Sequence, residues 1–250
     1  MRALRPAPLL ASAGGAPNGL TGQVLAAFFV TALFAALAYA LGMVSRGGAL
    51  GGLVVGIIIY YCLGPPGFAV LALFVVGGSL LTRLGYGRKR RAGTAEAGGG
   101  RRGARNALAN AGVAVACALL AASTSIDGST DAFVASLGAA FADTAESEVG
   151  QLYGRAPRLI TTLRRVAAGT DGAISLPGTL AGLAAAGLTA ALGMVLGLVE
   201  GVAPMLLVAL AAFLGTVIDS LIGALAPRVG NELTNFFCTL VAAVLALFST

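Results

Sequence analysis

Long apolar runs recur along almost the whole chain of 250 residues, and they limit its fold more than any other feature. Several approach or exceed the roughly 18 to 20 residues that an α-helix needs to cross a hydrocarbon core about 30 Å thick. A closed membrane barrel would instead show short segments of alternating polarity. Only 10% of the residues are charged, whereas a soluble domain has about 25%. The sequence therefore predicts an all-α, polytopic transmembrane helix bundle.

Turn signals and polar segments divide these runs into about eight spans within one domain. Residues 1–20, rich in Pro, Gly and Ala, are expected to form a flexible tail, and residues 21–250 a single transmembrane domain. A basic loop at 83–106 and a second polar loop at 151–176 interrupt this domain. The spans are expected at about 24–44, 49–63, from the 64–67 turn to 82, from the basic loop to 122, in a fifth segment ending at 142–150, and at 176–199, 202–226 and 232–248.

The distribution of positive charge predicts how the bundle is oriented. With both termini extracytoplasmic, fourteen of the sixteen Lys and Arg residues face the cytoplasm, all except Arg2 and Arg5. This agrees with the excess of cations that cytoplasmic loops carry. The cations are not interleaved with aromatic residues that could stack on bases. We therefore expect the lipid bilayer, and no nucleic acid, as a partner, and a homo-oligomer stays open.

Two of the predicted helices carry acidic and hydroxyl side chains near their cytoplasmic ends. Asp143 and Ser147 are four residues apart and share a helix face, Glu148 follows them, and Asp219 precedes Ser220. Carboxylates from two helices can hold Mg²⁺, which keeps several waters and is usually completed by substrate phosphates. Histidine is absent, so a metal site here relies on oxygen ligands. The alternative is that these acids only pair with arginines or fix helix packing.

Further polar groups suit the binding of phosphate. The loop at 151–176 contains an arginine followed by two hydroxyls, and then a glycine-bounded turn that can approach an anion closely. Amides four residues apart share a face at the starts of the fourth and eighth helices. The alternative for the loop arginines is that they only orient the protein in the membrane. The candidate nucleotide- or phosphate-binding residues are Ser147, Thr161, Thr162, Gly169, Thr170, Asp171, Ser220, Arg102, Asn106, Asn110, Asn231 and Asn235.

Several of these segments resemble, in the same order, a family of integral membrane proteins that includes the plant phytyl-phosphate kinase of vitamin E synthesis and human transmembrane protein 19. The resemblance covers most of the chain from about Ser45 to Phe248. Its most specific parts are ADTAESEVG (142–150), PRLITT (157–162), GTDG (169–172) and GTVIDSLIGA (215–224), with NELTNFF (231–237) and SLLTR (79–83) in support.

The resemblance implies a membrane-embedded isoprenyl-phosphate kinase. Such an enzyme transfers the γ-phosphoryl group of a nucleoside triphosphate, CTP in particular, to a prenyl monophosphate such as phytyl, geranylgeranyl or farnesyl phosphate, giving the diphosphate. Carried over onto this chain, Asp143, Glu148 and Asp219 bind Mg²⁺ and form the catalytic group together with Arg158. We expect a Mg²⁺-dependent phosphotransferase in a prokaryotic plasma membrane, with its active site on the cytoplasmic side.

The chain departs from the family pattern at a few positions. Ala142 stands in place of a usual glycine, Ala145 and Glu146 in place of a Trp-Ala pair, and Asp171 where asparagine is common. These departures concern the range of substrates and, to a lesser degree, the activity. Two alternatives stay open: a CTP-dependent lipid-phosphate cytidylyltransferase, which would leave CMP on the lipid and release pyrophosphate, and a transporter, which predicts polar residues and broken helices near the bilayer midplane.

Overall fold

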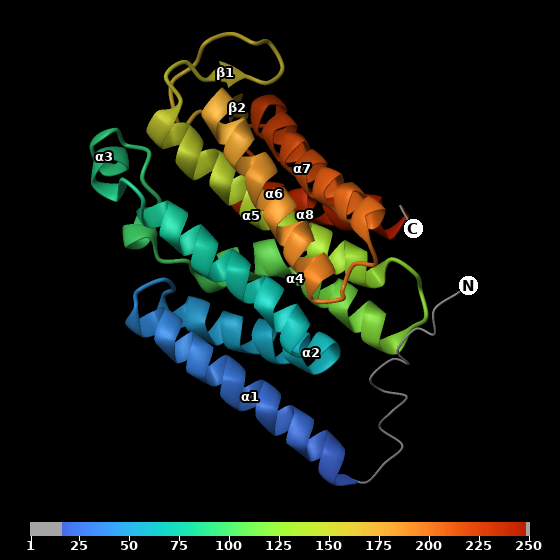
Figure 1. Ribbon diagram of the computed structural model, residues 1–250. Helices are drawn as coiled ribbons and strands as arrows, with labels where there is room; N and C mark the ends of the chain where they lie inside the picture. The colour runs from blue at the N-terminus through green and yellow to red at the C-terminus, as the bar shows by residue number, and fades with distance from the viewer. Residues whose placement is uncertain (1–16, 249–250) are drawn as a thin grey trace.

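The computed structural model describes residues 17–248, and helices make up most of this part of the chain (Figure 1). The predicted tail lies outside the described residues up to residue 16, and residues 17–20 already belong to the first helix. The helices of the described part are α1 (Pro17–Ala40), α2 (Arg46–Arg83), α3 (Tyr86–Arg91), α4 (Ala104–Ser123), α5 (Ser129–Tyr153), α6 (Leu176–Val195), α7 (Val202–Leu225) and α8 (Asn231–Leu247).

Helix α2 reverses direction at Gly64 and crosses the bundle twice. Gly64 has φ 64° and ψ −160°, a backbone conformation that glycine adopts at little steric cost. Pro65 follows and disfavours a helical backbone at the residue before it. The rings of Tyr60 and Phe68, on either side of the turn, pack edge to face with centroids 5.9 Å apart. The segments 46–63 and 65–83 therefore correspond to the second and third predicted spans.

Helix α5 is the central element of the bundle. It packs against α2, α4, α6, α7 and α8, and most of its residues are buried. Small residues permit this close packing, since an added Cβ at Gly138 would lie only 3.2 Å from the Cβ of Ala212 on α7. Because its neighbours shield α5 from lipid, this helix can carry polar and acidic residues that a lipid-facing helix could not.

The polar segments gather at one end of the bundle. The second half of α2, α5 and α7 run toward this end, whereas α4, α6 and α8 start from it (Figure 1). The segment predicted as a basic loop contains α3 and a short 3₁₀-helix, η2 (Ala97–Gly100). The second polar loop contains two-residue strands, β1 (Arg158–Leu159) and β2 (Ala173–Ile174), which pair antiparallel with Arg158 opposite Ile174. We call this end the polar rim.

The fold confirms the predicted polytopic helical membrane protein. Five helices of the described part, α1, α2, α4, α6 and α7, are long and apolar enough to cross a membrane. The largest exposed side chains on their outer faces are apolar, as lipid contact requires. Helix α8 is shorter, and α5 is less apolar because it is surrounded by protein. With the two halves of α2 counted separately, α1, α4, α5, α6, α7 and α8 complete the set of helices that correspond to the predicted spans.

Candidate active site

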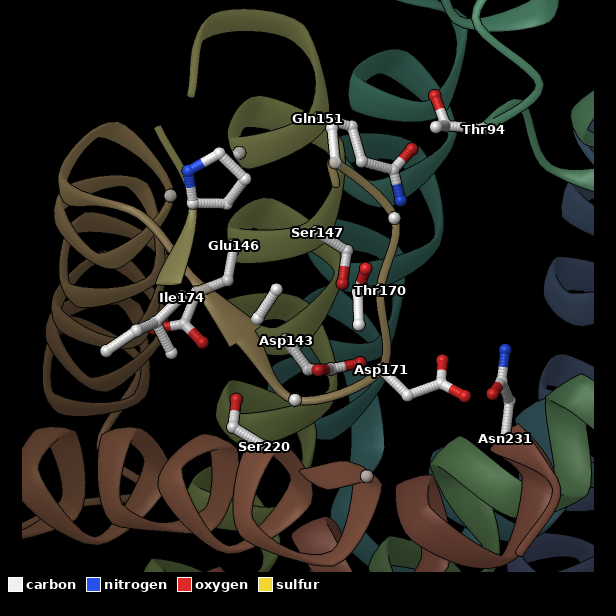
Figure 2. A pocket seen from close by; sticks show the side chains of 18 of the residues that line it. Thr94, Asp143, Glu146, Ser147, Gln151, Thr170, Asp171, Ile174, Ser220 and Asn231 are labelled. Atoms are coloured by element: carbon white, nitrogen blue, oxygen red, sulfur yellow. The ribbon is translucent and has the colours of Figure 1, made fainter. Parts of the chain in front are cut away.

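A cavity of about 580 Å³ opens at the polar rim between α5, α7 and the two polar segments. Figure 2 shows the side chains of Asp143 and Ser147, from α5, directed toward the Thr170–Asp171 segment, with Ser220 of α7 below them. Nine of the sixteen predicted site residues line this cavity: Asp143, Ser147, Gly169, Thr170, Asp171, Asp219, Ser220, Asn231 and Asn235. The structure thus brings together residues that are up to 92 positions apart in the sequence.

Acidic side chains dominate the charge of the cavity. Its lining includes the five carboxylates of Glu96, Asp143, Glu146, Asp171 and Asp219, and no Lys or Arg side chain from the described residues. Like charges gathered in a partly buried site repel one another unless a cation compensates them. Cations that accompany an anionic substrate would compensate this charge and so favour binding in the cavity.

Two buried oxygen atoms in the cavity have no hydrogen-bond partner in the described part of the chain. They are Oδ1 of Asp219 and Oε1 of Gln151. A buried polar atom without a partner costs about 1–3 kcal/mol, so such atoms mark places where a ligand, an ion or a water is expected. Both are acceptors, which suits a cation or a donor group.

Helix C-termini, with negative potential, and helix N-termini, with positive potential, lie on different sides of the cavity. Asp143 and Asp219 lie on the C-terminal halves of α5 and α7, whose dipoles favour cations. The starts of α6 and α8 contribute the N-cap Ser175, whose Oγ accepts from the Gly178 N–H at 3.3 Å, and Asn231, in the first turn of α8; the positive ends of helix dipoles favour anions. A cation held by α5 and α7 therefore faces an anion site at α6 and α8. This arrangement suits a metal–phosphate complex.

The glycine turn of the second polar loop is fixed against α7. Gly172 has φ 73°, and a Cβ at this position would lie 2.5 Å from the backbone oxygen of Ser220 and 2.5 Å from the backbone nitrogen of Ala224. Only glycine permits this approach without displacement. The contact holds the turn that contains Thr170 and Asp171 against the acidic end of α7.

The donor set of the cavity fits Mg²⁺ in a particular way. No group of three or more His, Cys, Asp or Glu side chains converges on one metal position within residues 17–248. The site therefore provides one or two carboxylates, from Asp143 and Asp219, rather than a complete cage. Mg²⁺ is commonly bound in this manner, with waters and substrate phosphates as the other ligands. The unpartnered Oδ1 of Asp219 supports this assignment.

Glu148 does not reach the cavity. A helix turns by 360° in 3.6 residues, so Glu148 lies about 140° around α5 from Asp143. Its carboxylate instead forms a buried ion pair with Lys89 of α3, and the Lys89 Nζ also donates to the carbonyl of Thr82 at 2.9 Å. Glu148 therefore holds α3 against the bundle and does not line the cavity with Asp143 and Asp219.

The arginine-hydroxyl segment also lies outside the cavity. Arg158, Thr161 and Thr162 are exposed. The Arg158 guanidinium donates to the carbonyl of Leu163 at 2.7 Å and so closes the tip of its own loop. These three residues do not contact the cavity in this arrangement, because the strand pair β1–β2 directs the tip away from α5 and α7.

The polar stripe of Arg102, Asn106 and Asn110 faces a different part of the bundle. Arg102 and Asn106 line a second, apolar cavity between α1, α2 and α4. Asn110 is buried, and its Nδ2 donates to the carbonyl of Asn106 at 2.9 Å. The stripe therefore exists as predicted from its spacing, but it does not line the acidic cavity.

Several residues that line the acidic cavity were not among the predicted site residues. Helical spacing could have identified three of them, since Glu146 and Gln151 follow Asp143 and Ser147 by three and four positions, and Thr234 lies between two predicted amides. Thr94 and Glu96 could not be found in this way. They reach the cavity only because the Lys89–Glu148 ion pair docks the segment before them.

Comparisons with known proteins place the chain in a family. No solved structure matches it. An uncharacterised membrane protein of Synechocystis sp. is 39% identical over 201 residues, which cover 78% of this chain and 78% of that protein. One of Methanocaldococcus jannaschii is 32% identical over 203 residues, covering 80% and 83%. The chloroplastic Protein VTE6 of Arabidopsis thaliana is 34% identical over 147 residues, covering 56% and 44%. The family model of integral membrane protein DUF92 matches residues 29–243, and the chain belongs to this family.

Proposed function

We propose that the protein is a membrane-embedded isoprenyl-phosphate kinase, which transfers a phosphoryl group from a nucleoside triphosphate, CTP in particular, to a prenyl monophosphate. The observation that carries this proposal is the distribution of charge in the acidic cavity. Carboxylates line the cavity, and no basic side chain of the described residues does. The N-termini of two helices also open into it. A nucleotide complexed with Mg²⁺ satisfies all three features, because the metal neutralises both the carboxylates and the phosphates.

Different residues of the cavity would bind the metal and the phosphate groups. Asp143 and Asp219 would hold Mg²⁺, which supplies neutralisation of the charge on the transferred phosphoryl group. The hydroxyls of Ser147 and Ser220 line the same cavity and are suited to donate to phosphate oxygens, whereas the hydroxyl of Thr170 donates to the carbonyl of Ala167 at 2.8 Å. Phosphoryl transfer depends mainly on positioning and on charge neutralisation. A histidine base is not needed, because the acceptor is already an anion.

Family membership supports the same reaction at a coarser level. The DUF92 match confirms the family expected from the motifs at 142–150 and 215–224. The similarity to Protein VTE6 suggests a membrane prenyl-phosphate kinase-like role for the family, and hence a lipid substrate. The nucleotide and the length of the prenyl chain are proposals for this chain.

The orientation of the bundle supports nucleotide access from the cytoplasm. All fourteen Lys and Arg residues of the described part lie at or beside the polar rim. Because cytoplasmic loops carry such an excess of cations, we place the rim and its cavity on the cytoplasmic side of a prokaryotic plasma membrane. Nucleoside triphosphates are present there.

The test is a transfer assay with the purified full-length protein, Mg²⁺ and geranylgeranyl, farnesyl or phytyl monophosphate. CTP and ATP are supplied in separate reactions with label at the γ- or at the α-phosphate. A kinase places γ-label in the lipid diphosphate and leaves α-label in the nucleotide. Label from the α-phosphate in the lipid would identify a cytidylyltransferase instead, and absence of label from the lipid in all reactions would contradict both.

A further inference from the structure

A second cavity lies within the bundle beside the acidic one. It is a narrow slot of about 60 Å³ between α1, both halves of α2 and α4, with almost entirely apolar walls. The two polar side chains at its rim end, Arg102 and Asn106, belong to the start of α4 and the segment before it. The slot therefore has an apolar body and a polar end, which is the pattern of an amphiphilic ligand with one charged group.

The guanidinium of Arg102 is partly buried and has few partners within the protein. One of its nitrogens donates to Oγ1 of Thr144 at 3.0 Å, and the group lies 5.1 Å from the ring centroid of Phe74. It pairs with no carboxylate of the described residues. Burial lowers the pKa of Arg102, since the surroundings disfavour its charge. A guanidinium has five N–H donors suited to phosphate, and most of them are unused here.

Asn106 provides an independent sign that the polar end of the slot can bind a ligand. Its Oδ1 is buried and has no hydrogen-bond partner in the described part of the chain. A buried polar atom without a partner is costly. Rotation of the amide by 180° exchanges the oxygen for the NH₂ group, so Asn106 can present either an acceptor or a donor to a ligand beside Arg102.

The polar end of the slot borders the acidic cavity. Thr144, which accepts the hydrogen bond from Arg102, is the neighbour of Asp143 on α5. The charge of Arg102 is also close enough to be influenced by Glu96 and Asp143, both of which line the acidic cavity. An anion at Arg102 therefore lies next to the place where we put the transferred phosphoryl group.

We propose that Arg102 and Asn106 form the phosphate end of an acceptor site, in which a prenyl monophosphate lies with its chain in the slot between α1, α2 and α4. This assignment rests on the proposed function. An oxygen of the acceptor phosphate forms the new bond to the γ-phosphorus, the bond between that phosphorus and the β–γ bridging oxygen breaks, and the nucleoside diphosphate leaves with the electron pair.

Entry of a chain requires the slot to widen. Helix α1 forms one wall, through Thr31, Phe34 and Ala38. It packs chiefly against α2, and much of its surface is exposed. Among the walls, α1 is the one that can move with the least loss of packing (Figure 1). A slim, unbranched or methyl-branched chain fits such a slot better than the two chains of a phospholipid.

The experiment measures equilibrium binding of radiolabelled geranylgeranyl monophosphate to the full-length protein in nanodiscs, without nucleotide. Unlabelled geranylgeranyl monophosphate should compete with the labelled compound. Three other compounds should compete at least about tenfold less well: geranylgeraniol lacks the charge, inorganic phosphate lacks the chain, and phosphatidic acid has two chains instead of one. Equal competition by phosphatidic acid would overturn the proposal in favour of a general phospholipid site.

Two substitutions test the two ends of the slot. Arg102→Gln should weaken binding at least about tenfold through loss of charged hydrogen bonds, and the exposed neighbour Arg101 provides the control Arg101→Gln. Gly52→Leu should narrow the slot, because Gly52 lines it and an added Cβ would meet no other atom within 4 Å, so the leucine is accommodated without displacing its neighbours. Gly112→Leu, on α4 and also with open space around it, is the matched control.

Binding of Mg²⁺–CTP and the melting temperature are measured for each variant. A folded Arg102→Gln or Gly52→Leu protein that binds the prenyl phosphate like the parent would overturn the acceptor site. We expect Arg102→Gln to remain folded, because Arg102 is only partly buried and has no carboxylate partner among the described residues. If prenyl phosphate binds as described but no phosphoryl group is transferred from any nucleotide, the proposed function fails while the binding site stands.

Discussion

At the scale of single residues, charge pairing decides which acids are available for chemistry. Glu148 and Lys89 satisfy each other in a buried ion pair. Asp143 and Asp219 line the cavity without a salt bridge to any basic side chain of residues 17–248. A paired acid has no free charge to offer a metal, whereas an unpaired acid in a cavity does.

Breaking the Lys89–Glu148 pair should destabilise the protein. Lys89→Met or Glu148→Gln alone leaves one partner buried without compensation, which costs about 3–5 kcal/mol. The double variant Lys89→Met/Glu148→Leu should recover most of this loss, because both charges are gone. Thermal unfolding in detergent measures the effect, and single variants as stable as the parent would contradict a buried pair.

Sequence spacing identifies the correct helix faces but not every partner. Asp143 and Ser147 are four residues apart, so they share a helix face, and both line the cavity. Glu148 is five residues from Asp143, so it lies on a different face of α5 and does not line the cavity. The partner of Glu148 could not be predicted, because Lys89 lies 59 positions away in a segment that composition alone marks as a loop. Long-range pairing of this kind depends on packing that a single sequence does not reveal.

At the scale of elements, the second polar loop acts as one wall of the cavity through its contact with α7. The antiparallel pair β1–β2 closes the loop, and Gly172 brings it against the backbone of α7. The glycine-rich turn could be predicted from the sequence. The strand pair could not, because two-residue strands leave no periodic pattern.

Gly172→Ala should detach this loop from α7. The added Cβ would lie 2.5 Å from backbone atoms of α7, so the loop has to move. Gly99→Ala is the control, since Gly99 also has a positive φ of 72° but open space around it. Limited trypsin digestion should cut the loop several-fold faster at Arg158 and Arg164 only in Gly172→Ala. Equal rates in both variants would show that the contact does not hold the loop.

At the scale of the whole molecule, the up-and-down course of the helices puts the two long polar segments, 83–106 and 151–176, at one end. Apolar run lengths and the two turn signals at Gly64 and Pro65 were enough to predict the long helices and the reversal within α2. The small side chains along α5 do not reveal in the sequence that this helix is central. Its place at the centre of the bundle follows from its contacts with α2, α3, α4, α6, α7 and α8.

Cysteine labelling can test which end of the bundle faces the cytoplasm. Thr162, in the second polar loop, and Ser125, between α4 and α5, are both exposed and lie at opposite ends. The native cysteines are buried and should give little background. In intact cells, a membrane-impermeant maleimide should label Ser125→Cys and should label Thr162→Cys only after lysis. The reverse pattern would put the acidic cavity outside the cell.

The most direct test of the account compares phosphoryl transfer by Asp143→Asn and Asp219→Asn with that of the parent. Each variant removes one carboxylate that would hold the metal, and we expect kcat/KM for transfer of γ-label to the prenyl phosphate to fall about 100-fold or more. Glu200→Gln, which neutralises an exposed acid at the far end of the bundle, should leave it unchanged. Full transfer by both aspartate variants would show that the acidic cavity is not the site of phosphoryl transfer.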